Sequence, residues 1–332
     1  MQSFKRLGRK FCLFAAAVFL AGCATVNVPV PVTHSAEINM SPYKQIAISR
    51  IKGNMGQDFS DGIKDKLVES SLFKVVDRDQ LDGIMRELNM SQSDLSDSHK
   101  RLKLGKLLSA SALITGHAYD KYREKLTYEN ETCGDKKHGY YPCRYFTRTG
   151  WVLTSGGIDV IDVQTGQIIK SKLLGHRCAA YTHAYDAYPD LIDKDALLGQ
   201  CLSEDVATFI KAISPWRETV MVPFLKDGDI PALESGINEA KLGDMPSALK
   251  IFSDAAAAAQ SNPKIKNTAL AKAYWDMGLA YEYSDRWDSA ITNLKKAFMM
   301  DSSLNVPQEI AHVRRLRIDQ ERLARQEAGA SQ

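Results

Sequence analysis

The spacing of apolar residues changes along this chain and divides it into two folded parts. Between residues 43 and 216, short apolar runs alternate with segments whose apolar residues recur every three or four positions. The first pattern is typical of strands, and the second places apolar side chains on one face of an α-helix. From about residue 230 only the helical spacing remains. The pattern therefore predicts a mixed α/β domain followed by an all-α domain.

The first part is predicted to follow the order β-α-β-α-α-β-β-β-α. The expected strands are Gln45–Ser49, Phe73–Val76, Ala112–Gly116, Thr149–Val163 and Gln167–Leu174. The expected helices lie around Phe59–Leu67, Leu81–Leu88, Lys100–Leu108 and Asp193–Ile213. This order indicates an α/β sandwich over residues 43–216, with helices packed on one mixed or antiparallel sheet.

Residues 230–303 carry the residue spacing of two tetratricopeptide-like repeats. The clearer copy is centred on Gly278 and has Tyr274, Met277, Tyr281, Ala290, Leu294 and Ala297 at the intervals of that repeat. The weaker copy has Gly236, Gly243, Ala248, Phe252 and Ala255. Residues 304–328 place apolar side chains on one side and are expected to form a capping helix, which repeat arrays need for solubility. A plain helical hairpin without a groove is the alternative.

Repeats of this kind present a groove formed by their first helices. Asp276, Leu279 and Tyr283 lie off the framework positions of the clearer copy. We therefore predict that they bind a protein partner, because an aromatic body with polar tips suits a peptide or a helix.

The N-terminus is typical of a signal that directs lipidation. Basic residues precede a short apolar run, and the segment ends in Leu20-Ala21-Gly22-Cys23, which resembles a bacterial lipobox. Residues 1–22 are therefore predicted to be removed and Cys23 to be acylated, with an ordinary cleaved signal as the alternative. Residues 23–42 contain three prolines and are expected to form an extended tether. Ala24, and not Asp, follows the acylated cysteine, and the resemblance to lipoprotein sorting signals of double-membrane bacteria then implies the outer membrane.

Export into an oxidising compartment decides how the remaining cysteines are interpreted. Four cysteines can pair in three ways, and short loops favour Cys133–Cys143 and Cys178–Cys201. The alternative is a metal site built from His138, His176, Cys178 and His183, but their spacing matches no standard zinc pattern. The sequence therefore predicts two disulfides and no metal.

Charge and motif content exclude several classes of function. The 332 residues have a formal net charge of +3, but residues 1–22 contribute four basic residues and no acid, which leaves the rest at −1. The basic surface of a nucleic-acid binder is thus absent. The sequence has no Gly-rich phosphate loop, Gly-x-Ser-x-Gly or His-Glu-x-x-His motif. We therefore expect neither an enzyme nor a cofactor.

Three phrases of the α/β part carry a family resemblance. DGIKDKLVESSLFKVVDRDQLDGIMREL at 61–88, KLGKLLSASALITGHA at 103–118 and GIDVIDVQTGQIIKSK at 157–172 resemble the CsgG family of curli secretion lipoproteins, in the same order. The resemblance implies the α/β sandwich, a lipid anchor, a role in moving or assembling extracellular fibres, and a homo-oligomeric ring. Inserted hairpins form a membrane pore in the curli channel, but charges at alternate positions of residues 119–128 predict that this chain forms none.

These observations predict an accessory protein rather than a catalyst. The favoured function is a lipid-anchored scaffold at the outer membrane that assists assembly or secretion of curli-like fibres or another envelope structure. The alternative is a lipoprotein that activates a periplasmic cell-wall synthase. The 19 tether residues that follow Cys23, Ala24–Pro42, reach at most roughly 60 Å, which favours work close to the membrane.

Overall fold

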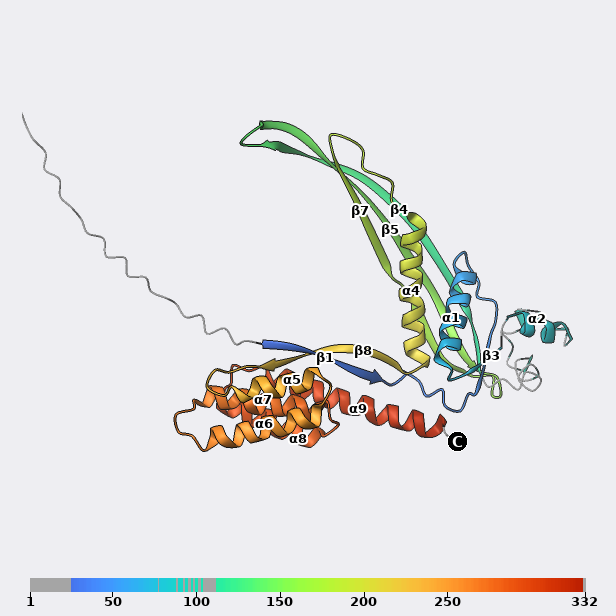
Figure 1. Cartoon of the computed structure of the whole chain (residues 1–332). Helices are drawn as coiled ribbons and strands as arrows, with labels where there is room; N and C mark the ends of the chain where they lie inside the picture. Colours follow the sequence, from blue (N-terminus) through green and yellow to red (C-terminus); the bar gives the residue numbers. More distant parts are fainter. Residues whose placement is uncertain are drawn as a thin grey trace, which may run out of the picture. The chain divides into compact units, whose positions relative to one another are not determined.

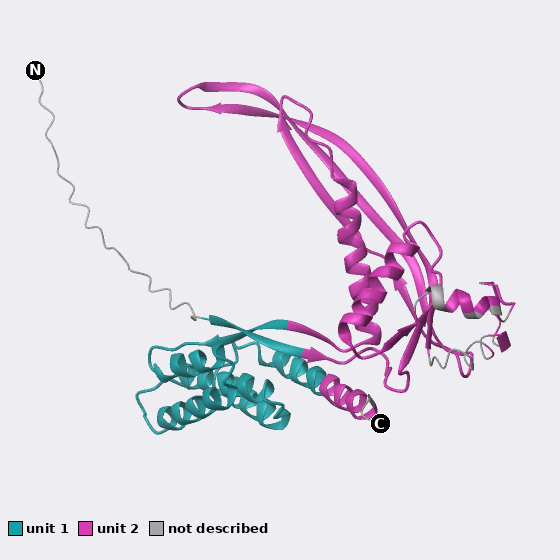
Figure 2. Cartoon of the chain, turned by 45° about the vertical axis from the view of Figure 1, so that its right-hand side comes forward, with its two compact units in different colours: residues 1–32, 219–317 teal, residues 33–218, 318–332 magenta. Residues whose placement is uncertain are grey.

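The computed structural model describes residues 25–76, 78–87, 89–91, 93–94, 97, 99–100, 103 and 112–330. These residues form two compact units (Figure 2). The first, the helical unit, contains residues up to 32 together with 219–317. The second, the sheet unit, contains residues 33–218 and the C-terminal segment from 318. The predicted signal, Cys23 and most of the helix expected at 100–108 lie outside the described residues.

The sheet unit is built on a six-stranded mixed sheet. Its strands are β2 (Gln45–Ile48), β3 (Lys74–Val76), β4 (Ala112–Asp135), β5 (Gly139–Asp162), β6 (Ile168–Leu174) and β7 (Arg177–Tyr185). Strand β2 lies between β3 and β4 and is parallel to both, whereas β5 runs antiparallel to β4, β6 and β7. The 24-residue strands β4 and β5 form one long hairpin that projects beyond the rest of the sheet (Figure 1).

Helices cover the two faces of this sheet to different extents. Helix α1 (Gly56–Ser70) and α4 (Lys194–Ile213) bury one face, where Phe59 and Phe209 pack with Ile158 and Val160 of β5. Helix α2 (Arg78–Glu87) packs on the opposite face, but only near the short strands β2 and β3. Because neighbouring residues of a strand point to opposite faces, the even-numbered residues of β5 meet α1 and α4.

The helical unit contains two consecutive helical hairpins. Helices α5 (Ala232–Lys241) and α6 (Met245–Gln260) form the first, and α7 (Asn267–Glu282) and α8 (Trp287–Met300) form the second. The glycines predicted from the repeat pattern lie where the helices touch: a Cβ on Gly236 would be 2.4 Å from the Phe252 ring, and one on Gly278 would be 2.7 Å from Leu294. The helices therefore approach closely at the predicted positions.

Two strands and a long helix complete the fold. Strands β1 (Thr25–His34) and β8 (Trp216–Leu225) pair with each other, and α9 (Val306–Ala330) ends the chain. The boundary between the units falls inside all three elements. Helix α9 follows the predicted capping helix closely, although its last part belongs to the sheet unit.

The mixed α/β fold predicted from the sequence is present, but several elements differ from the prediction. Much of the predicted tether forms β1 instead, because Val28, Val30 and Val32 alternate with exposed residues and are buried. Strands β7 and β8 were not predicted, and both strands of the long hairpin extend well beyond the expected limits. Polar residues of β4, β5 and β7 obscured the strand pattern because this part of the six-stranded sheet is exposed on one side.

Candidate functional site

The end of the sheet formed by β4, β5 and β7 has one covered face and one face that we call the open face. On the covered face, Val152 and Cys178 pack against Leu197 and Cys201 of α4. The strand register places odd-numbered residues of these strands on the other side. No helix among the described residues packs there. The open face carries Tyr145, Trp151, Tyr181, His183 and Tyr185.

Aromatic side chains on the open face support one another and remain accessible. The ring of Tyr145 lies 4.8 Å from that of Tyr185 and stacks on His183 at 5.3 Å. Tyr181 and Tyr185 are 60% and 55% exposed. Tyrosine is enriched at interaction sites because it provides a rigid apolar body with a polar tip. The surface therefore has the composition of a protein-binding site.

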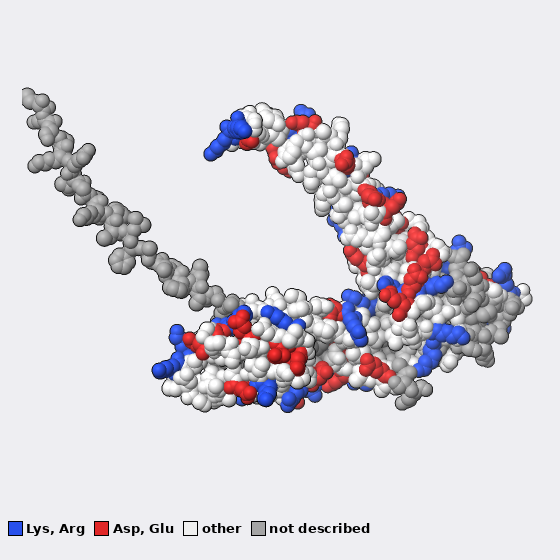
Figure 3. Space-filling view, viewed as in Figure 1, with Lys and Arg blue, Asp and Glu red and all other residues white. Residues whose placement is uncertain are grey.

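Charged residues on the open face are segregated along β4. Lys121, Arg123 and Lys125 occupy one half of the strand, and Glu129 and Glu131 occupy the half nearer the tip. Figure 3 shows acidic and basic side chains along this projecting part, with uncharged surface between them. From Lys121 onward β4 pairs only with β5 among the described residues, so its other edge is free. A free edge can accept another strand.

The covered face is closed near the tip by the segment that follows β7. Tyr188 packs on Phe146 at 5.5 Å, and Phe146 also contacts Tyr128 across the hairpin at 5.6 Å. Arg148 donates through Nε to the carbonyl of Pro189 at 3.3 Å. The adjacent aromatic residues at 145 and 146 thus point to opposite faces, which the sequence alone did not reveal.

Both predicted cysteine pairs are disulfide-bonded in the structure. Cys133–Cys143 joins β4 to β5 beside the turn, and Cys178–Cys201 joins β7 to α4, each with a Cα–Cα distance of 5.7 Å. Cys178 is therefore not available as the metal ligand considered as an alternative. The two bonds hold the hairpin tip together and fix the covered face, so that the open face is presented on a braced sheet.

The residues predicted to bind a partner in the helical unit occupy different environments. Asp276 and Leu279 are fully buried, and Tyr283 is partly buried at the end of α7. Leu279 belongs to the apolar core of this unit. Burial removes Asp276 and Leu279 from any surface that a partner could touch, and this corrects the prediction.

The physical reason is that a strand of the same chain lies against α7. Asp276 Oδ1 accepts the backbone N–H of Leu225 at 2.8 Å, and Trp275 Nε1 donates to the carbonyl of Pro223 at 3.0 Å. Both backbone groups belong to the end of β8. These are the contacts expected for a peptide bound in a groove, but the occupant is the chain itself.

Burial also changes the chemistry of Asp276. Its pKa is raised well above the ordinary value because desolvation disfavours the charged carboxylate, although the Leu225 hydrogen bond and Lys272 act in the opposite direction. Its second oxygen, Oδ2, is buried without a hydrogen-bond partner. The carboxyl therefore has the features of a structural group rather than a contact residue.

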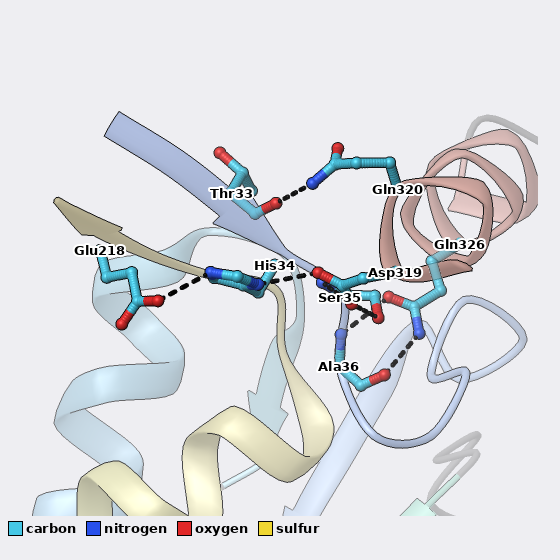
Figure 4. A network of polar contacts seen from close by, with 8 residues as sticks. All are labelled: Thr33, His34, Ser35, Ala36, Glu218, Asp319, Gln320 and Gln326. Carbon is cyan, nitrogen blue, oxygen red and sulfur yellow. Dashed lines mark hydrogen bonds and ion pairs between the residues drawn. The ribbon is translucent and has the colours of Figure 1, made fainter. Parts of the chain in front are cut away.

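A polar network inside the sheet unit fixes residues 33–36 to the last part of α9 (Figure 4). His34 lies between two carboxylates, 2.8 Å from Asp319 and 3.0 Å from Glu218. The Gln326 side chain both donates to and accepts from the backbone of Ala36, each at 3.0 Å. The Gln326 side chain thus pairs with both the N–H and the C=O group of Ala36, as the backbone of a neighbouring strand would.

Within the described residues, no helix has the length and apolar content needed to cross a membrane. Lipidation at Cys23 stays a prediction, since that residue lies outside them.

Comparison with known proteins finds one family model, which matches the N-terminal third of the chain. A lipoprotein from Neisseria meningitidis, GNA1162, covers 50% of this chain and 96% of its own length at 12% identity, with a TM-score of 0.26. The LpoB C-terminal domain from Escherichia coli covers 42% of this chain and 83% of its own at 15% identity, with a TM-score of 0.24. No curated protein matches. Residues 21–125 match the family described as curli production assembly/transport component CsgG, so the resemblance seen in the sequence is confirmed for this part.

Proposed function

We propose, on the premise that residues 21–125 form a CsgG-like domain, that this protein is a lipid-anchored envelope accessory that self-associates into a scaffold. The scaffold would assist the assembly or secretion of a surface or envelope structure, from the periplasmic face of the outer membrane. The observation that carries this proposal is the open face of β4, β5 and β7, because it combines exposed tyrosines with a free strand edge.

A second copy of this chain is the occupant that the charges favour. The basic half of β4 on the open face, around Arg123, complements the acidic half around Glu129. Two copies related by a two-fold axis, or successive copies in a ring, can place the basic half of one against the acidic half of the next. Such complementarity fixes register and disfavours other partners.

The experiment measures oligomeric mass by light scattering coupled to size exclusion, at low and high salt. The unaltered protein is expected to be an oligomer that weakens as salt screens the charges. Changing both Tyr181 and Tyr185 to serine should yield monomers. Tyr188→Ser is the matched control, because this exposed tyrosine belongs to the segment that closes the covered face.

A charge exchange tests the orientation of the copies. Lys125→Glu should weaken the oligomer, and adding Glu129→Lys should restore it, because the double variant reverses both halves of the contact. The proposal would be contradicted if the protein is monomeric under every condition. It would also be contradicted if the oligomeric mass is the same in the open-face variants as in the unaltered protein.

A further inference from the structure

Three side chains that can bind a metal ion lie together in the helical unit. Glu282 ends α7, and Glu309 and His312 lie in the part of α9 that belongs to the same unit. One ligand atom from each lies within 4.8 Å of the others. His312 Nδ1 is 2.7 Å from Glu282 Oε1 and 3.7 Å from Glu309 Oε1. Glu309 and His312 are three residues apart and therefore share one face of α9.

The buried carboxylate of this cluster is only half satisfied. Glu282 is fully buried, and its Oε1 is bonded to His312. Its second oxygen, Oε2, is buried without a hydrogen-bond partner. A buried carboxylate is costly unless it is paired or coordinates a metal. Glu282 Oε2 is thus an unused acceptor in a cluster of metal-binding groups.

The carboxyl of Glu309, beside Glu282, also lacks enough nearby positive charge to favour its ionised form. Burial, next the negative charge of Glu282 and then a side-chain hydrogen bond to Glu282 raise the pKa of Glu309 to about 7, although His312 and Arg315 act in the opposite direction. The pKa of His312 is raised, chiefly by its hydrogen bond to Glu282. A divalent cation would supply the missing charge to both carboxylates.

We propose that Glu282, Glu309 and His312 bind a divalent transition-metal ion of the Zn²⁺ class and thereby tie α9 to α7. A tetrahedral site with bonds of about 2.0–2.1 Å separates its ligand atoms by roughly 3.3 Å. The two distances from His312 Nδ1, 2.7 and 3.7 Å, bracket that value, and all three ligand atoms lie within 4.8 Å of one another before any metal draws them together. The Glu-x-x-His spacing on one helix is also used by carboxylate metal centres in helical bundles.

The imidazole gives the cluster one side that solvent can reach. The side chain of His312 is 37% exposed, whereas Glu282 lies on the inner side. A metal can therefore arrive from solvent past the imidazole. One imidazole and two carboxylates form a mixed nitrogen and oxygen set, which suits Zn²⁺ better than Ca²⁺ or Mg²⁺. The competing occupant is a proton shared between the two carboxyls, which would satisfy Glu282 without a metal.

Calorimetric titration with ZnCl₂ separates these two occupants. The full chain is used in a background with Cys12→Ser and Cys23→Ser, so that no thiol competes, and is first treated with EDTA. We expect one ion per chain, with affinity reduced at least tenfold in His312→Ala and in Glu309→Gln. Hydrogen exchange of residues 306–317 should slow when Zn²⁺ is added.

His138→Ala is the matched control, because His138 is an exposed histidine that pairs with Asp135 elsewhere in the chain. It should leave the affinity unchanged. Circular dichroism checks that each variant is folded. If His312→Ala does not fold, the affinity of Glu309→Gln for Zn²⁺ tests the proposal in its place. The proposal is overturned if no binding occurs up to millimolar Zn²⁺, or if binding survives unchanged in the folded ligand variants.

Discussion

Replacing Asp276 tests whether β8 is held against α7 by the carboxyl that the structure places there. Asp276→Ala removes the acceptor of the Leu225 N–H, which is buried. A buried N–H without a partner costs about 1–3 kcal/mol. Since 1.4 kcal/mol is about a factor of ten, local opening of β8 should become roughly 5- to 150-fold more frequent.

Asp276→Asn is the matched variant, because its amide oxygen can still accept the Leu225 N–H while the titrating group is removed. The raised pKa of Asp276 means that the folded chain keeps a proton that the unfolded chain loses above the ordinary value of 3.8. The stability that Asp276 contributes is therefore complete below that pH and is lost as pH rises through the raised folded-state pKa. Asp276→Asn should abolish this decline.

The assay is hydrogen exchange followed by mass spectrometry on peptides that cover residues 219–226, at pH 5 and pH 8 with rates corrected for intrinsic exchange. Asp276→Ala should exchange faster at both pH values, and Asp276→Asn should protect β8 equally at both. The unaltered chain should be better protected at pH 5. If the alanine variant matches the unaltered chain, β8 is not held by this bond and the explanation of the burial of Asp276 fails.

Three further predictions concern the disulfide at the hairpin tip, the contacts between helices and the lipidation of Cys23. Cys133→Ser should raise exchange at the hairpin tip, residues 133–143, and leave α4 unaffected, because that bond closes only the turn. Gly278→Ala should destabilise the helical unit by about 1–3 kcal/mol in urea titrations, because its Cβ would meet a side chain. Gly199→Ala in α4, where nothing lies within 4 Å, should instead be neutral or stabilising by up to about 1 kcal/mol. Cys23→Ser should abolish incorporation of labelled fatty acid, and label that still enters would contradict the lipobox interpretation.

Features that depend on residues close together in the sequence could be predicted from the sequence. The C-terminal helices appear at the expected positions because their apolar spacing is local and Gly278 leaves room for a close contact. The disulfide pairs follow from loop length, since short loops cost the least entropy to close. The CsgG resemblance also rested on contiguous phrases, and two of the three, at 61–88 and 103–118, lie within the residues that the family model matches.

Features that depend on what packs against a residue were decided only by the tertiary structure. Asp276 had the pattern of a groove residue, yet β8, about fifty residues earlier, lies over it and buries it. Tyr145 and Phe146 are adjacent in the sequence, but the pleat of the strand sends them to opposite faces of the sheet, and α4 packs on only one of these faces. The cluster of Glu282 and His312 joins helices thirty residues apart, and no local period marks such a contact. Burial and proximity are properties of the packed elements, so a pattern that reads only along the chain does not contain them.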